Sequence, residues 1–392
     1  MTKITNDIYY VGANSYSVDL FEGQFEVPKG MAYNSYIIMD EKTAVFDTAD
    51  AIVTDQWFCN VKEALGDKEP DYIIVQHMEP DHSANLLDFC NKYPKVTVVS
   101  SAKSFAIMKN FFGTDFSDRR LIVGEGDKLS LGRHELTFIT APMVHWPEVI
   151  VTYDSLEKTL FSADAFGKFG AIADDDEDWA YEARRYYFGI VGKYGAQVQS
   201  LLKKAASLDI QRICPLHGPV LDRKLKRYFD LYNTWSSYEA ETKGILIAYA
   251  SAYGYTAEAA LTLAKRLLAD DFINISVLDI SRDDQSEAIS EAFRYDRLVL
   301  AASTYNGDVF PTMRDFLNRL VERGYKKRTI ALIQNGSWAP CAAKVMRQIL
   351  EPCRELNFLD TVITINSAVN DETREQLQVL AKELEALGRP EY

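Results

Sequence analysis

From Gly244 onward, the sequence alternates between short apolar runs and amphipathic stretches, and this rhythm strongly limits the possible folds. Helical stretches such as residues 256–269 and 311–324 separate apolar runs that have the length and composition of buried strands. Buried strands joined through helices are typical of a doubly wound parallel sheet. We therefore predict a five-stranded parallel α/β domain whose strands lie within residues 245–251, 274–280, 297–303, 328–334 and 361–367.

The loop after the first of these strands has the properties of a phosphate site. Ser251 and Thr256 offer hydroxyl groups, Gly254 is flexible, and a helix is expected to begin near Thr256. Free backbone N–H groups and the positive end of the dipole make a helix start attractive to anions. The loop lacks both the Gly-Lys-Ser/Thr of triphosphate-binding loops and the Gly-x-Gly-x-x-Gly of dinucleotide folds. We expect a phosphate held by neutral donors.

Two further loops follow the third and fourth strands and carry Tyr305 and Trp338, which could cover a planar ring. Ligands of open parallel sheets bind outside the carboxyl ends of the strands. Residues 244–392 resemble flavodoxin, whose ligand is FMN. The last loop, NGSWAPCAA, departs from the usual glycine-rich tryptophan loop, so stacking of Trp338 on a flavin stays open. The candidate FMN-binding residues are Ser251, Tyr253, Gly254, Tyr255, Thr256, Ser303, Thr304, Tyr305, Asn306, Gly307, Asn335, Gly336, Ser337 and Trp338.

The N-terminal half mixes hairpins with helices. Residues 33–50 and 149–164 each indicate two strands around a turn, whereas residues 71–77 and 95–101 indicate short strands followed by helices. This density predicts two sheets sandwiched between helices. The polar stretch 236–244 separates the two regimes, so we predict domains at residues 1–243 and 244–392.

Seven possible metal ligands follow apolar strands in this half. His77, Glu79 and Asp81 alternate along an extended segment and therefore point the same way, and His82 follows at a helix start. Four of the five histidines belong to the set, and His134, at a polar strand start, is interpreted as a surface residue. Nitrogen and oxygen ligands without a thiolate suit iron, manganese or zinc. The complete set is His77, Glu79, Asp81, His82, His145, Asp164 and His217.

This series resembles the metallo-β-lactamase fold, with Glu79 where that fold commonly has histidine. A flavin domain beside the site favours redox-active iron over zinc. Followed by a flavodoxin-like domain, the series resembles the flavodiiron proteins, also called A-type flavoproteins. The resemblance implies one iron held by His77, Glu79 and His145, another held by Asp81, His82 and His217, and Asp164 as the bridge. It also implies a catalytic tyrosine near the metals, for which Tyr194 is the candidate.

The same resemblance implies reduction of dioxygen to water, of nitric oxide to nitrous oxide, or both, with electrons delivered through FMN. It further implies a head-to-tail homodimer or a dimer of dimers. For the electron donor, the resemblance allows a separate rubredoxin, a reductase or a reduced deazaflavin. No Cys-x-x-Cys pair occurs among the five cysteines, which excludes a rubredoxin module in this chain.

Composition narrows the alternatives. A net charge of −14 argues against nucleic-acid binding, which needs a basic surface. The apolar runs are too short to cross a membrane, and the first residues lack the apolar core of a secretory signal, so we expect a cytoplasmic protein. The densest acidic run, DDDED, is interpreted as a solvated loop. Two rivals remain: a binuclear zinc hydrolase with an accessory flavodoxin domain, and an electron carrier without metals.

Overall fold

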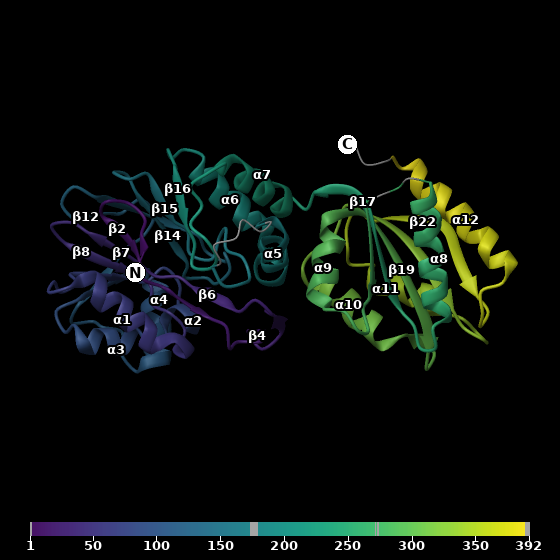
Figure 1. Ribbon diagram of the computed structural model, residues 1–392, viewed down its shortest axis with the longest axis horizontal. Helices are drawn as coiled ribbons and strands as arrows, with labels where there is room; N and C mark the ends of the chain where they lie inside the picture. The colour runs from purple at the N-terminus through teal and green to yellow at the C-terminus, as the bar shows by residue number, and fades with distance from the viewer. Residues whose placement is uncertain (1, 173–178, 271, 273, 389–392) are drawn as a thin grey trace. The chain divides into compact units, whose positions relative to one another are not determined.

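The computed structural model describes residues 2–172, 179–270, 272 and 274–388, and the acidic run DDDED lies outside them. The chain forms two compact units (Figure 1). The N-terminal unit comprises Met1–Tyr187 and Ala196–Asn233, and the C-terminal unit comprises Phe188–Gly195 and Thr234–Tyr392. The C-terminal unit begins ten residues before the predicted domain boundary and also includes residues 188–195. The domain boundary after residue 243 therefore stays a prediction.

The N-terminal unit contains two β-sheets. Phe46 of the first sheet stacks on Phe161 of the second with ring centroids 4.0 Å apart, in one apolar core shared by both sheets. Burying an apolar face of each sheet against the other drives this layering. The first sheet has the order β1 (Thr2–Lys3), β2 (Ile8–Tyr10), β7 (Tyr36–Met39), β8 (Thr43–Phe46), β9 (Tyr72–Ile74), β10 (Thr97–Ser100) and β11 (Arg120–Ile122). The second has the order β12 (Lys128–Ser130), β13 (Glu135–Thr140), β14 (Ile150–Asp154), β15 (Thr159–Phe161) and β16 (Arg212–Cys214).

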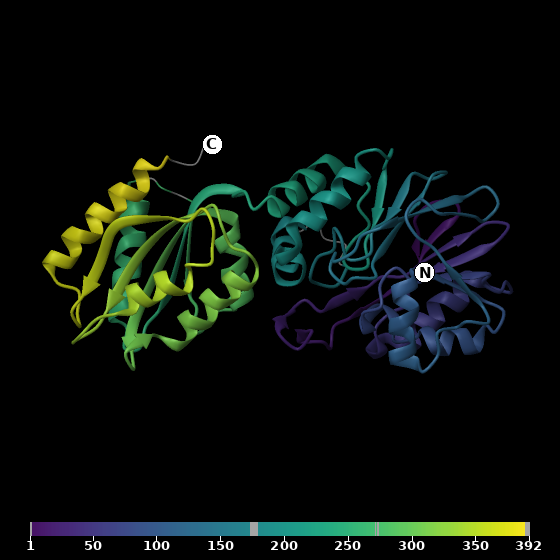
Figure 2. The same cartoon turned by 180° about the vertical axis from the view of Figure 1, so that it is seen from behind.

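Helices cover the outer faces of this sandwich, as the two opposite views show (Figures 1 and 2). On the side of the first sheet lie α1 (Thr54–Leu65), α3 (Leu86–Lys92) and α4 (Ala102–Phe112). On the other side lie α5 (Trp179–Tyr186), α6 (Gly195–Ala205) and α7 (Leu225–Ser236). Two small ribbons, β3 (Ala13–Ser15) with β6 (Met31–Tyr33) and β4 (Leu20–Phe21) with β5 (Phe25–Glu26), complete the unit. The sandwich predicted from the sequence is confirmed.

The C-terminal unit is a parallel sheet with helices on both faces. Its strand order is β18 (Ile275–Asp279), β17 (Thr242–Ala250), β19 (Tyr295–Tyr305), β21 (Thr329–Asn335) and β22 (Asn357–Ile365), with β20 (Asp308–Val309) paired antiparallel to β19. Because the first strand lies between the second and third, this is the flavodoxin-like order. All five predicted strands are confirmed.

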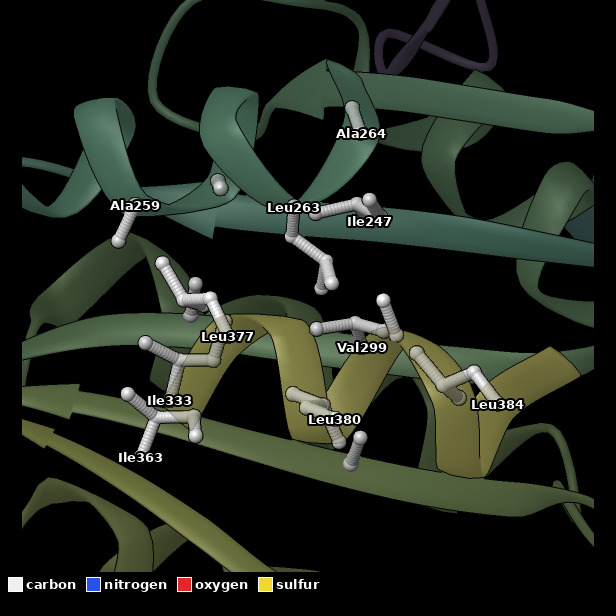
Figure 3. Packing of buried hydrophobic residues seen from close by; sticks show 14 of the residues in the cluster. Ile247, Ala259, Leu263, Ala264, Val299, Ile333, Ile363, Leu377, Leu380 and Leu384 are labelled. Atoms are coloured by element: carbon white, nitrogen blue, oxygen red, sulfur yellow. The ribbon is translucent and has the colours of Figure 1, made fainter. Parts of the chain in front are cut away.

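The helices of this unit are α8 (Tyr255–Ala269), α9 (Gln285–Arg294), α10 (Pro311–Glu322), α11 (Ala342–Ile349) and α12 (Asp371–Ala386). On one face, Leu263 of α8 and Leu380 of α12 meet Val299 and Ile333 of the sheet, all fully buried (Figure 3). Burial of each such side chain stabilises the unit by about 1.5–3 kcal/mol.

The interpretation of His134 as a surface residue is wrong. Its side chain is fully buried, with Nδ1 2.9 Å from Asp154 Oδ2 and Nε2 3.3 Å from Asp7 Oδ2. The residue stands before β13, yet Asp7 reaches it from a segment 127 positions away. The polar residues next to His134 in the sequence do not show that a distant residue, Asp7, will pack against it.

Candidate metal centre and flavin cleft

The seven predicted ligands all lie just beyond the ends of strands. His77 and Glu79 follow β9, and the short helix α2 (Pro80–Ser83) adds Asp81 and His82. Pro80 occupies the first turn of α2 and Glu79 is extended, so the chain turns into the helix between the second and third ligands. The other three follow strands of the second sheet: His145 after β13, Asp164 after β15 and His217 after β16.

The side chains gather in two groups, each with ligand atoms within 4.8 Å of one another. The first group contains His77, Glu79, His145 and Asp164, and the second contains Asp81, His82 and His217. Glu79 Oε2 lies 3.2 Å from His77 Nε2 and 3.0 Å from His145 Nε2. In the second group, Asp81 Oδ2 lies 3.1 Å from His82 Nε2 and 3.2 Å from His217 Nε2.

Asp164 connects the two groups through separate oxygen atoms. Its Oδ2 lies 3.1 Å from His145 Nε2 and 3.3 Å from His77 Nε2. Its Oδ1 lies 3.3 Å from His82 Nε2 and 3.7 Å from His217 Nε2. One carboxylate oxygen facing each set of imidazoles is the arrangement of a bridging ligand.

The electrostatics of the cluster fit two cations. Burial alone disfavours every charged form. Against that effect, the rings of His145 and His77 lower the pKa of Glu79 to about 2. Likewise, burial opposes the charged ring of His82, but Asp81 and Asp164 raise its pKa to about 10. Oδ1 of Asp81 is buried without a hydrogen-bond partner, which leaves its lone pairs available to a metal ion.

A second site lies in the C-terminal unit, where the loops after β17, β19 and β21 surround a cleft of about 510 Å³. Thr256, in the first turn of α8, is buried and its Oγ1 lies 3.0 Å from Ser303 Oγ. Gly254 caps α8 with a φ of +93°, and its N–H donates to Ser251 Oγ. Only glycine adopts this conformation without strain. The helix start and its hydroxyl groups fit an FMN phosphate.

All predicted flavin residues except Gly254 line this cleft, together with three that the sequence did not indicate, namely Ala252, Ala339 and Ser367. Ser367 follows the fifth strand, and its N–H and carbonyl bond to the Asn335 side chain. Its position after β22 was a usable signal, because all the other lining loops also follow strands. Tyr253 and Trp338 are 92% and 83% exposed at the cleft.

Comparison with known proteins agrees with the two-part organisation of the chain. Residues 31–218 match the family described as "ODP family beta lactamase", and residues 246–357 match the family described as "Flavodoxin domain". A nitric oxide reductase from Moorella thermoacetica is 28% identical over 361 residues, which cover 90% of each chain. The flavodiiron protein from Giardia intestinalis shares the fold with a TM-score of 0.90 and 24% identity, covering 98% of this chain and 97% of that one. Rubredoxin oxygen:oxidoreductase from Desulfovibrio gigas matches with a TM-score of 0.89 and 24% identity over 98% of both chains. The chain belongs to the flavodiiron family of oxidoreductases.

This membership favours the redox interpretation over the zinc hydrolase. Apart from residues 188–195, the first match lies in the N-terminal unit with the candidate metal ligands, and the second match lies in the C-terminal unit with the flavin cleft. Across the described part of the chain, no helix combines the length and apolar composition needed to span a membrane.

Glu79 and Asp81 of the predicted ligand set line a pocket of about 290 Å³. Aromatic rings pack around the second group: the centroids of Phe21 and Tyr186 lie 5.3 and 5.5 Å from that of His217. The Tyr186 hydroxyl is buried and has no hydrogen-bond partner. Burial and the nearby carboxylates of Asp164, Asp81 and Glu79 raise its pKa well above the ordinary value. The pocket is lined by Val18, Leu20, Phe21, Glu22, Tyr33, Asp50, Ile52, Glu79, Pro80 and Asp81.

Tyr194, the tyrosine predicted from the sequence, occupies a different place. It lies in a short 3₁₀ helix (Gly192–Tyr194) within residues 188–195, which pack with the C-terminal unit. Among the described residues, no contact joins it to a metal ligand. The structure brings Tyr186 to the ligands instead, eight positions earlier in the same tyrosine-rich stretch. A sequence with so many neighbouring tyrosines does not indicate which of them points inward.

Sequence reasoning also missed Glu148, three positions after His145. Its side chain is 1% exposed, and Oε1 lies 2.9 Å from His77 Nδ1. The motif APMVHWPE contained this residue, but a glutamate beside a ligand has no signature that separates a surface position from a buried one.

Proposed function

We propose that this chain reduces dioxygen to water, nitric oxide to nitrous oxide, or both, at a pair of iron ions supplied with electrons through FMN. The observation that carries the proposal is the buried set of seven ligands with Asp164 between its two groups. The relatives support it, because their names are nitric oxide reductase and rubredoxin oxygen:oxidoreductase. The flavin cleft in the same chain supports redox chemistry over hydrolysis.

The predicted ligands form two sets, one for each metal ion. His77, Glu79 and His145 would hold one ion, and Asp81, His82 and His217 the other, with Asp164 contributing one oxygen to each. When bound, the iron pair supplies the gas-binding and redox chemistry, and FMN supplies further electrons. Three carboxylates neutralise part of the metal charge, while the buried surroundings keep competing water away.

We assign the tyrosine role to Tyr186 in place of Tyr194. A tyrosine hydroxyl is protonated at neutral pH, and burial with the nearby carboxylates raises the pKa of Tyr186 further, so this hydroxyl can donate one hydrogen bond. It has no protein acceptor, and its ring packs on His217. A neutral donor beside the ligands can orient a substrate atom there without adding charge to the pocket.

In the C-terminal unit, the cleft would hold FMN. Ser251, Thr256 and Ser303 surround the start of α8 and would receive the phosphate with neutral donors. Tyr305 ends β19 and Trp338 lies on the loop after β21, and at the cleft both can contact a flat ring.

We further propose a head-to-tail homodimer. Tyr253 and Trp338 are largely exposed at the flavin cleft, and Leu20 and Ile52 are 42% and 51% exposed at the metal pocket. A second copy would cover both apolar rims and bring one chain's flavin to the other's metals. The electron donor would be a separate rubredoxin, a reductase or a reduced deazaflavin.

Anaerobic purification tests the function. We expect about two iron ions and one FMN per chain, and consumption of one or both gases when the flavin is reduced. Comparing the two rates under one donor determines the preferred substrate. Stoichiometric zinc after expression in iron-rich medium, or an iron-loaded and FMN-loaded protein that consumes neither gas, would contradict the proposal.

A further inference from the structure

Glu148 links a metal ligand to the opposite sheet. It precedes β14, a strand of the second sheet, whereas His77 follows β9 of the first. Its Oε1 lies 2.9 Å from His77 Nδ1 and accepts from the Met78 N–H at 3.0 Å. Its own backbone oxygen accepts from Ser101 Oγ at 2.9 Å. Glu148 is therefore held at both its main chain and its side chain, and it cannot turn away from His77 without breaking these bonds.

Two other predicted ligand histidines, His217 and His82, are held differently. His217 Nδ1 lies 2.7 Å from the backbone oxygen of Ala32, which is a neutral acceptor. His82 Nδ1 is buried and has no hydrogen-bond partner. Of these three rings, His77 alone meets a carboxylate through the nitrogen that faces away from the ligand cluster.

The consequence follows from imidazole chemistry. A carboxylate on Nδ1 keeps the proton there, so that Nε2 presents its lone pair to the metal site. It also fixes the ring orientation and increases the basicity of the ligand atom. A backbone oxygen orients a ring equally well but adds no negative charge, and an unpartnered nitrogen does neither.

We propose that Glu148 is a positioning residue for His77 and that it selectively strengthens metal binding by the group His77, Glu79 and His145. The inference rests on the proposed metal-binding function, which it deepens by assigning the two ions unequal support. Loss of Glu148 therefore weakens one ion of the pair before the other.

Two variants separate charge from hydrogen bonding. Glu148→Gln keeps the size and one oxygen acceptor but removes the charge, and Glu148→Leu removes both. Asp154→Asn is the matched control: Asp154 Oδ2 lies 2.9 Å from His134 Nδ1, and both side chains are fully buried in the same unit. Neither residue of that pair belongs to the predicted ligand groups, so the control removes a buried carboxylate charge outside them.

The full-length protein and each variant are loaded anaerobically with ferrous iron and equilibrated against graded chelator. Iron per chain and the melting temperature of the metal-free protein are then measured. For wild type we expect two retained ions. Glu148→Gln should lose one ion at a chelator concentration about 10-fold lower than wild type requires, and Glu148→Leu at a concentration up to about 100-fold lower. The chelator concentration that removes the second ion should change less. Asp154→Asn should retain both ions like wild type.

The outcomes are distinct. A wild-type protein that binds no iron would contradict the proposed function itself. Two ions retained equally by wild type and by Glu148→Gln and Glu148→Leu would overturn the positioning role alone. Equal weakening of both ions, or the same loss in Asp154→Asn, would also overturn it, because general destabilisation would then explain the result. If Glu148→Leu does not fold, Glu148→Gln decides, since its melting temperature shows whether the fold is intact.

Discussion

The two units build their sites in opposite ways. The candidate metal centre of the N-terminal unit collects seven ionisable side chains from both sheets and buries almost all of them. The flavin cleft of the C-terminal unit lies at one edge of a single sheet, and none of its described lining residues is charged. The first site is costly to assemble without its cations, because each buried charge depends on the others. The second is complete without its ligand, since neutral groups bear little desolvation cost. We therefore expect substitutions to act cooperatively in the first and locally in the second.

The largest effect is expected for Asp164→Asn, which removes a charge that two cations would share. The metals dominate the local electrostatics, so the loss should exceed the 10–100-fold typical of residues behind the ligands. Iron content, magnetic coupling and gas turnover should all fall, with turnover reduced on the order of 100-fold or more. Asp154→Asn, a buried carboxylate in the same unit, is the control. Unchanged iron and coupling in Asp164→Asn would show that Asp164 is not the bridge.

Phe188→Ala sharpens the division between the units. Phe188 follows Tyr186 closely in sequence, yet it stacks on Phe293 of α9 with centroids 4.0 Å apart, and its backbone oxygen accepts from Arg323. Because Phe188 is fully buried, the truncation should destabilise the C-terminal unit by about 3–5 kcal/mol. Flavin fluorescence and chemical unfolding would measure it, with half-exposed Phe111 of the N-terminal unit changed to alanine for comparison. Loss of iron with unchanged flavin binding would contradict the assignment of this segment to the C-terminal unit.

A smaller, local effect is expected for Thr256→Val in the flavin cleft. The change keeps the side-chain shape but leaves part of a phosphate without a donor, at about 1–3 kcal/mol. FMN affinity should fall by about one to two orders of magnitude, while iron content stays the same. Thr262→Val on the same helix α8, away from the cleft, is the matched control. FAD in the wild-type protein, or equal FMN affinity in Thr256→Val, would be incompatible with this assignment.

The smallest effect concerns His134, a buried histidine of the N-terminal unit outside the metal site. Burial works against the charged ring, but Asp154, Asp7 and Asp40 outweigh it and raise its pKa above the ordinary value. A raised folded-state pKa stabilises the protein fully below the unfolded pKa of about 6.5 and loses that contribution as pH rises through the folded value. His134→Gln should therefore cost about 1 kcal/mol at acidic pH and less at alkaline pH. Denaturant unfolding of metal-free protein across this range measures it, and a pH-independent difference would contradict the assignment.

The sequence predicted the parts of each unit that depend on local pattern. Apolar runs and turn residues predicted the five parallel strands. Residues that follow the predicted strands indicated the candidate ligands and nearly all the residues that line the cleft. Strand ends are informative because the sheet itself brings them together. The resemblance supplied the pairing of the candidate ligands into two groups, and their side chains lie together in two such groups, with metal binding itself still a proposal.

Tertiary structure alone decided what depends on distant contacts. Glu148 meets His77 across 71 positions, and Asp7 covers His134 across 127. Neither pairing can be predicted from hydrophobic periodicity, because periodicity shows only which face of one helix or strand is buried. The packing of Tyr186 on His217, and the place of residues 188–195 in the C-terminal unit, have the same origin. Residue chemistry and spacing determined what this protein could bind, and the packing of its sheets decided which side chains hold the binding groups in place.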